Sequence, residues 1–507
     1  MPRQPRGTRS VFSSRKRICC SAALLAAFTA AAGGQQQAAR VPLSGRAPQA
    51  GSVTSGQNAL TPVVQAGGEF SGSVSARAPF SGTLSLAEAI GRGLEYNLGA
   101  SQWGYTVEQA AGAARSAQAA LMPDLSGNLS GTVQQTDLKA MGFRLPPGTP
   151  FNFPAVVGPF SYMQLQASLS QTLLDLTANN NVRSSRQTLL ADRLELNDAR
   201  DQVVLGVGGA YLGVIAAEAR LDAQRAQLET ANAILSESQQ RQSVGALARL
   251  TVDQNQVQAS MEQLQLTSLR NDVDKQKINL ARMIGLPPRP DYTLADRVGF
   301  APPPALTLEA ALAQALERRA DLKAAAAQAE AARAALAAAK DERMPTAGFT
   351  GSYGVIGSTP VTDSHGVFSI TGTLRIPLWQ GGKVKGDIEQ ANAAVMQRDS
   401  EVADLRGAIE AQVREAYLDL NAAASQVTVA EGNLKVAQEA LEMAHERFQA
   451  GVINTVELIQ AQEAVATAQE NQIDSVYAHN VAKLTLARSL GDAPLAWQRY
   501  LPTSGKN

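Results

Sequence analysis

The 507-residue sequence predicts a mixed α and β membrane protein that contains two copies of one structural unit. Three observations predict this class: distant segments of the chain resemble each other, short segments alternate apolar with polar residues, and two very long stretches lack proline. The proline-free stretches lie between Pro159 and Pro287 and between Pro377 and Pro494. Lysine plus arginine and aspartate plus glutamate each number 45, so there is no basic excess and we expect no nucleic-acid partner.

Residues 1–32 are typical of a secretory signal peptide. Basic residues precede an apolar run, Ile18–Ala32, which ends in small residues at cleavage-site spacing. The run is shorter than the about 20 residues of a spanning helix, so an uncleaved anchor is the less favoured alternative. Cys19 and Cys20 are the only cysteines, and we expect a mature protein without disulfide, thiol site or acyl anchor. Residues 33–81 lack helical periodicity and predict a flexible low-complexity arm.

The remainder of the chain is a tandem duplication. The motif LSLAEAI at Leu84 recurs as LTLEAAL at Leu306, 222 residues later, and Gly245 recurs as Gly451, 206 residues later. The missing 16 residues fall mainly in a loop region, where changes of length are tolerated. We therefore predict a first repeat at 82–290, a linker at 291–305, a second repeat at 306–494 and a tail at 495–507.

Each repeat has the same predicted plan: helix, strand pair, very long helix, glycine break and return helix. The first helix is expected at Leu86–Leu121 and at Leu308–Arg343, and it ends at Pro123 or Pro345 because proline disfavours a helical residue before it. The long helix of the second repeat is expected at Lys383–Gln449, where apolar residues recur at spacings of three and four, as in a coiled-coil seam. Such a helix spans about 100 Å, and a coiled-coil stalk is the alternative interpretation of the helices alone.

Two segments in each repeat have a period of two, which is typical of strands with one apolar and one polar face. No segment outside the signal reaches the length of a spanning helix, so we expect strands to cross the membrane. Soluble hairpins packed on a helical core are the alternative that this alternation leaves open. The apolar positions include Leu125, Leu129 and Val133; Met163, Leu165 and Leu169; Phe349, Tyr353 and Val355; and Phe368, Ile370 and Leu374.

Four strands per chain cannot close a membrane barrel, because the smallest closed membrane barrels have about eight strands. In lipid, each unpaired N–H or C=O group at an open sheet edge costs several kcal/mol. The chain is therefore expected to oligomerise: two copies would give eight strands, three would give twelve, and geometry does not choose between them. The helices continue from the strands to one side, so the predicted shape is a tube suited to the passage of solute.

Three segments resemble the TolC family of outer-membrane factors: RFQAGVINTVELIQAQEAVATAQ at Arg447, YAHNVAKLTLARSLG at Tyr477 and IPLWQGGK at Ile376. The resemblance covers Leu84 to Pro494 and implies a channel rather than an enzyme. The implied fold is a trimeric 12-stranded outer-membrane β-barrel, four strands per chain, continued by a long α-helical coiled-coil barrel in the periplasm. The implied partners are two further copies in a homotrimer, outer-membrane lipid, a periplasmic adaptor (membrane fusion) protein and an inner-membrane transporter, with no cofactor.

The glycine breaks predict the tips of two helical hairpins, because glycine accommodates the positive φ that such a turn needs. The resemblance implies that these tips dock the adaptor, whereas a turn needed only for folding is the alternative. The tip residues are Val244, Gly245, Ala246, Ala450, Gly451 and Val452.

The resemblance also implies a pore constriction, lined by acidic residues near the start of a return helix. Glu457 is the carboxylate in the matching stretch, and three copies would form an anionic ring that favours cations. Gln460 takes the position where relatives often carry a second acid, and Asp253 near the first tip is a further candidate. A solvated helix charge is the alternative for each residue. Trp379, where strand meets helix, is expected at the periplasmic membrane interface.

We expect no catalytic or metal-binding site, because the three histidines, His365, His445 and His479, stand apart from other ligand-type side chains. Three functions fit the sequence. The first is the outer-membrane channel of a tripartite efflux or export system, and the second is the outer-membrane duct of a type I protein secretion system. The third, from another class, is a periplasmic coiled-coil interaction protein without a pore.

Overall fold

The computed structural model covers most of the duplicated region. Every described residue lies in the unit that comprises residues 51–507. The predicted signal peptide, most of the predicted arm and the end of the predicted tail lie outside the described residues. The described residues are 54–55, 62–63, 68–74, 80, 82–142, 154–289, 292–302, 305–358, 363–491 and 493–501.

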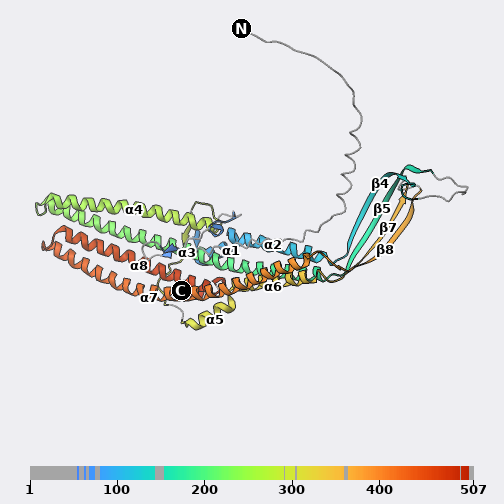
Figure 1. The fold of residues 1–507 in the computed structure, drawn as a ribbon. Helices are drawn as coiled ribbons and strands as arrows, with labels where there is room; N and C mark the ends of the chain where they lie inside the picture. The colour runs from blue at the N-terminus through green and yellow to red at the C-terminus, as the bar shows by residue number, and fades with distance from the viewer. Residues whose placement is uncertain are drawn as a thin grey trace, which may run out of the picture. The chain divides into compact units, whose positions relative to one another are not determined.

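The two repeats contain helices of matching length (Figure 1). Helices α1 and α5 have 11 residues each, α2 and α6 have 22, α3 and α7 have 68 and 67, and α4 and α8 have 35 each. Duplication of one unit accounts for this agreement. The predicted bounds of α7 are confirmed. The bounds are α1 Leu86–Tyr96, α2 Leu98–Ala119, α3 Leu176–Ser243, α4 Arg249–Met283, α5 Leu308–Arg318, α6 Ala320–Asp341, α7 Lys383–Gln449, α8 Thr455–Ser489 and α9 Ala493–Tyr500.

The single first helix predicted for each repeat is wrong, because the structure breaks it into two. α1 and α2 meet at Asn97, and α5 and α6 meet at Arg319, 222 residues further on. The ψ angles of these residues, 136° and 127°, take both out of the helical region. The Asn97 side chain accepts a hydrogen bond from the Gly99 N–H and caps α2, which is the usual role of asparagine at a helix start. We call these two breaks the first and second helix joints.

Each helix joint receives the end of the return helix from its own repeat. α4 is followed by Gly285 and α8 by Gly491, with φ angles of 72° and 71°. A Cβ added at Gly285 would lie 2.8 Å from Tyr96 Cβ, and one added at Gly491 would lie 2.8 Å from Arg319 Cα. Both the backbone conformation and the close approach therefore require glycine. Each joint therefore packs closely against the end of the return helix of its own repeat.

α3 lies at the centre of the helical part (Figure 1). Near the sheet, α3 packs between α2 and α6, and α6 packs against α7. Towards the hairpin tips, α3 packs between α4 and α8, and α8 packs against α7. α7 is therefore an edge helix along its length, and α2 and α4 form the opposite edge.

α3 contains a stretch long and apolar enough to span a membrane, so the expectation that no such segment follows the signal is wrong. The 18-residue window has a mean hydropathy of 1.5, but 61% of it is buried inside the protein. Val203, Val204 and Val207 of α3 are buried in the main core, and a Cβ added at Gly208 would lie 2.7 Å from Leu484 Cδ1 of α8. The apolar composition therefore serves close packing between helices.

The predicted strands are confirmed and form one antiparallel sheet in the order β4-β5-β7-β8 (Figure 1). Each repeat contributes one hairpin, and β4 and β8 are the two edges. The strands are β4 Asp124–Asp137, β5 Val156–Leu174, β7 Thr346–Gly357 and β8 His365–Arg375. Smaller elements are β1 Thr54–Ser55 with β2 Pro62–Val63, the 3-10 helix η1 Gly68–Ser71, and β3 Gly82–Leu84 paired in parallel with β6 Tyr292–Leu294.

The two strand-to-helix connections differ between the repeats. β5 passes directly into α3, and the Asp175 side chain between them accepts a hydrogen bond of 2.8 Å from the Ala178 N–H. β8 instead reaches α7 through a longer loop that ends in Gly381 and Gly382, both with positive φ. The segment SQTLLDLTANN, which begins at Ser170, therefore has an aspartate cap at the place where the second repeat has a Gly-Gly turn.

The joint packing predicts that Gly491→Ala destabilises the protein by about 2 kcal/mol, because the methyl group meets the Arg319 backbone and φ is positive. Gly91→Ala, on the exposed side of α1 with open space around it, should stabilise the protein by up to about 1 kcal/mol. Thermal unfolding of the two variants checks this, and equal unfolding midpoints would contradict the role of the joint.

Candidate functional site

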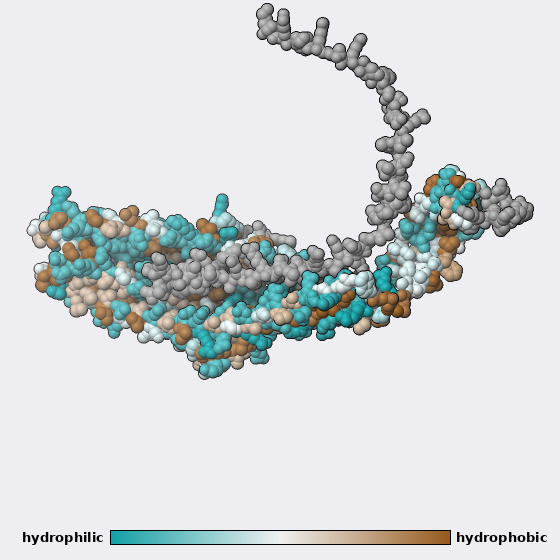
Figure 2. Space-filling model, viewed as in Figure 1, coloured by the Kyte–Doolittle hydropathy of each residue, from teal (hydrophilic) through white to brown (hydrophobic). Residues whose placement is uncertain are grey.

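The four-stranded sheet has one continuous apolar face. The register pairs Leu125 with Leu169, Leu165 with Val355 and Tyr353 with Phe368, so the apolar parity of every strand points the same way. Within the single chain these side chains are largely uncovered, and Ile370 is 76% exposed. Figure 2 shows apolar side chains at the surface of the sheet. An exposed apolar face that extends across four strands is typical of a surface that contacts a membrane or another protein.

The opposite face of the sheet is polar. Ser126 Oγ lies 2.9 Å from Ser168 Oγ across the β4–β5 pair, and Gln164 Nε2 donates to Gln166 Oε1 at 2.8 Å on the same face. Threonines of β8, including Thr371 and Thr373, extend this face to the other edge of the sheet. The sheet therefore has one apolar face and one polar face.

Trp379 stands where β8 gives way to α7, as predicted. Its side chain is 88% exposed, and the neighbouring Leu378 is exposed as well. The two glycines that follow, Gly381 and Gly382, set the direction of the chain into α7. The loop therefore presents an aromatic and an apolar side chain next to the end of the apolar sheet face.

Both hairpin tips have the same backbone geometry. Gly245 and Gly451 have φ angles of 76° and 72°, and each follows a long helix. The Val452 N–H donates to the Arg447 carbonyl at 2.9 Å, and the Gly451 N–H donates to the Phe448 carbonyl at 3.0 Å. The first tip repeats both bonds one repeat earlier, so each long helix ends in a Schellman motif.

The two tips pack against each other through α3, α7 and α8. Ile234, Phe448 and Leu458 form a buried cluster, and the Arg241 guanidinium lies 5.7 Å from the centre of the Phe448 ring. The tip side chains of Val244 and Val452 stay exposed. The two tips therefore pack together and leave the apolar side chains of Val244 and Val452 exposed.

Glu457 and Gln460 lie on one side of α8, in its first turns, and both are exposed. Asn454 caps this helix by accepting a hydrogen bond from the Glu457 N–H at 3.0 Å. Glu457 therefore lies in the first turn of α8, near the positive end of the helix dipole. Asp253 is exposed on α4 and lies 3.8 Å from Arg249, a surface pair of little energetic value. Among the described residues, neither a hydrogen bond nor an ion pair joins Asp253 to Glu457 or Gln460.

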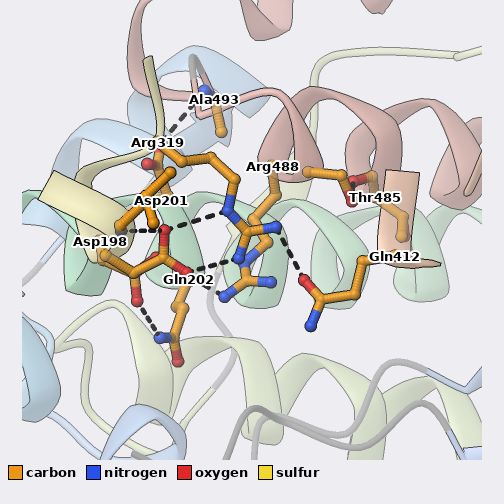
Figure 3. Close-up of polar contacts among 11 residues, drawn as sticks. Asp198, Asp201, Gln202, Arg319, Gln412, Thr485, Arg488 and Ala493 are labelled. Carbon is orange, nitrogen blue, oxygen red and sulfur yellow. Dashed lines mark hydrogen bonds and ion pairs between the residues drawn. The ribbon is translucent and has the colours of Figure 1, made fainter. Parts of the chain in front are cut away.

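A buried cluster of charges at the second helix joint was not predicted (Figure 3). Arg319 is only 3% exposed, and its guanidinium binds both carboxylate oxygens of Asp321, at 3.0 and 2.5 Å. Its third contact is a hydrogen bond of 2.7 Å donated to Gln412 Oε1 of α7. The bidentate pair fixes the guanidinium at the joint, and the bond to Gln412 connects the joint to α7.

α3 supplies the rest of the cluster (Figure 3). Asp198 lies 3.6 Å from Arg488 of α8 and accepts a hydrogen bond of 2.6 Å from Gln202. Asp201, one turn further along α3, accepts a hydrogen bond of 3.1 Å from the Ala493 N–H at the start of α9. The cluster thus connects α3, the second helix joint, α7, α8 and α9.

Burial decides the protonation of the carboxyl groups in this cluster. Burial and the Asp198 charge raise the pKa of Asp201 to about 7, although Arg488 opposes them. Burial likewise raises the pKa of Asp198, and burial together with Asp198 raises that of the half-buried Glu195 to about 8. Burial acts in the same direction on Asp321, but the hydrogen bonds and charge of Arg319 outweigh it and hold its pKa below the usual range.

The sequence carried a weak signal for this cluster. Asp192, Glu195, Asp198 and Asp201 recur every three residues on one long helix, just before its most apolar stretch. Arg488 belongs to the repeated motif Leu-Ala-Arg, but the arginine of the first copy, Arg282, is exposed. Duplication therefore drew attention to the motif without indicating which copy is buried.

A smaller polar contact fixes the linker between the repeats. The carbonyl oxygen of Ala301 accepts hydrogen bonds from His479 Nε2 at 2.9 Å and from Lys483 Nζ at 2.6 Å. Both side chains are buried on α8, and burial lowers the pKa of His479 and lowers that of Lys483 to about 8. His479 is therefore part of the packing between the repeats.

Comparison with known sequences gives one family and one relative. Residues 98–286 and 311–492 match the family described as Outer membrane efflux protein, and together they exceed two thirds of the chain. Outer membrane protein OprJ of Pseudomonas aeruginosa is 29% identical over 159 residues. That segment covers 29% of this chain and 32% of OprJ, so the chain matches about a third of the length of this relative.

Comparison with solved structures gives the same fold. A membrane protein from Pseudomonas aeruginosa aligns with a TM-score of 0.68 and 21% identity over 80% of this chain and 93% of that chain. The outer membrane protein VceC of Vibrio cholerae gives 0.65 and 20%, over 80% and 96%. The CmeC outer membrane channel of Campylobacter jejuni gives 0.70 and 16%, over 86% and 95%.

Proposed function

Because this chain belongs to the outer membrane efflux protein family, we propose that it forms the outer-membrane channel of a tripartite export system. The chain is an outer-membrane protein with a periplasmic extension. One observation carries the proposal: a four-stranded sheet with an apolar face, a polar face and two edges that lack partners among the described strands. Lipid against the apolar face and water against the polar face account for both faces.

Three copies of the chain complete the channel in this proposal. In lipid the edges β4 and β8 need partners for their backbone groups, and joining β8 of one copy to β4 of the next supplies them. Three copies give a ring of twelve strands, which agrees with the trimer that the family resemblance implies.

The edge helices support the same assembly. α4 and α7 each carry exposed apolar side chains at helical spacing, although they lie outside the sheet. Neighbouring copies would cover these stripes and extend the ring along the helices, which span about 100 Å. The residues are Leu250, Val257, Met261 and Leu264 on α4, and Leu418, Val429, Val436 and Met443 on α7.

The hairpin tips are the proposed docking site for a periplasmic adaptor, which in turn engages an inner-membrane transporter. They lie at the end of the helices opposite the sheet (Figure 1). Their exposed side chains, Val244 and Val452, are apolar, and the Schellman turns hold them in a fixed conformation. Glu457 and Gln460 lie just past the second tip, where three copies would surround the entrance to the pore.

Gly451→Trp is expected to abolish export while trimer formation and membrane insertion persist, because the bulk blocks docking at the tip. Gly451→Asn is the matched control, since asparagine tolerates positive φ and adds little volume. Export is measured in cells that lack the native channel, and the trimer is assessed by native electrophoresis. Normal export by a folded Gly451→Trp trimer would count against docking at this tip.

The wild-type protein in planar bilayers is expected to conduct, with a preference for cations that Glu457→Gln weakens because the charge ring is lost. Glu463→Gln is the control, since six residues turn this exposed carboxylate to another side of α8. Reversal potentials in a salt gradient give the selectivity. Unchanged selectivity in Glu457→Gln removes the constriction role, and a wild-type protein that never conducts overturns the channel itself.

A further inference from the structure

The second helix joint holds more buried acid than base. Among the described residues, Asp198, Asp201 and Asp321 face two guanidinium groups, Arg319 and Arg488. Arg319 is committed to Asp321, and Arg488 is the cation nearest to Asp198. One buried carboxyl group is therefore left without an ion-pair partner.

That group is Asp201, which is 5% exposed. It accepts a hydrogen bond from the backbone N–H of Ala493, the first residue of α9, and the preference of this donor for a charged acceptor is outweighed by burial and by Asp198. Among the described residues, the nearby Arg488 pairs with Asp198 instead. The charges that act on it are Asp198 on α3, Arg488 on α8 and Asp321 at the start of α6, with Arg319 acting on Asp198. A desolvated carboxyl group in this position favours its neutral form.

The first helix joint shows that such charge is not needed to build a joint. Its break residue is the neutral Asn97, whose side chain donates to the carbonyl groups of Phe70 and Met283. Gly99 stands 222 residues before Asp321, and the exposed Arg282 stands 206 residues before Arg488. The cluster therefore combines Asp198 and Asp201 of α3, in the first repeat, with charges at the second helix joint that the first joint lacks.

We propose that Asp201 is the titrating group of a proton-dependent latch, which holds α9 and the second helix joint against α3 when the carboxyl group is neutral. Loss of the proton places a second negative charge one helical turn from Asp198, inside a cluster whose cations are already engaged. The resulting repulsion loosens the contacts that connect α3 to α6, α8 and α9. Because the joint lies between the sheet and the hairpins, the latch controls how firmly these two parts are held together.

The direction of the pH effect follows from the raised pKa of Asp201, about 7 when folded, above the about 3.9 of an unfolded aspartate. A carboxyl group with a raised folded pKa contributes full stability below its unfolded pKa and loses it as pH rises through the folded value. The latch is therefore tightest in acid, weakens progressively between about pH 4 and about pH 7, and is open above that range.

Hydrogen–deuterium exchange on the full chain in detergent, corrected for intrinsic rates, tests the latch at pH 5.5 and pH 8. In the wild-type protein, peptides covering residues 316–323 and 493–500 should lose about tenfold in protection at pH 8. Asp201→Asn keeps the acceptor for the Ala493 N–H without the charge, and its loss of protection at pH 8 should be several-fold smaller than that of the wild-type protein, with Glu195 accounting for the remainder. Asp222→Asn, an exposed position on the same helix, should retain the wild-type difference.

Two results would overturn the latch: equal protection of the wild-type joint at both pH values, or a wild-type pH difference in Asp201→Asn. A second measurement does not depend on the folding of any variant. The thermal unfolding midpoint of the wild-type protein should fall between pH 5.5 and pH 8. A midpoint that is constant or rises over this range would contradict the proposal.

Discussion

The backbone groups along β4 and β8 are the constraint on which the rest of the structure depends. Among the described strands, each of the two has a partner on one side only, and their sheet carries a continuous apolar face. An outer-membrane chain cannot leave such edges in lipid at several kcal/mol for each unpaired group. The proposed assembly of copies through these edges satisfies them. In that assembly the ring continues into the helices, because β5 and β8 lead into the long helices α3 and α7.

The helices extend the sheet into a long structure that is stabilised mainly by α3. This central helix has an apolar stretch and packs against α2 and α6 near the sheet and against α4 and α8 towards the hairpin tips. The joints at Asn97 and Arg319 allow α1 and α5 to change direction while α2 and α6 continue towards the sheet. Gly285 and Gly491, which follow the return helices, pack closely against these joints, so the same contact recurs at the equivalent position of each repeat.

Much of this architecture could be predicted from the sequence, because it depends on periodicity. The alternation of apolar and polar residues predicted the four strands of the sheet. The bounds of α7 followed from a proline-free coiled-coil pattern that begins after Gly381 and Gly382 and ends before Gly451. The joints could not be predicted: Arg319 lies in an alanine-rich helical sequence, and its ψ of 127° is imposed by packing against Gly491. The buried charges were missed for the same reason, since burial of Arg488 but not Arg282 depends on tertiary contacts. Family membership, rather than alternation, distinguishes membrane strands from soluble hairpins.

Cross-linking of the two sheet edges tests the central claim most directly. Both native cysteines lie in the predicted signal peptide, so engineered thiols can be read without background. Cysteine pairs would combine Ser126, Asn128 or Ser130 of β4 with Ser369, Thr371 or Thr373 of β8, all on the polar face. On oxidation in membranes, the account predicts that at least one pair gives a covalent ladder ending at three chains. A ladder that ends at two chains, or no cross-link from any pair, would contradict it.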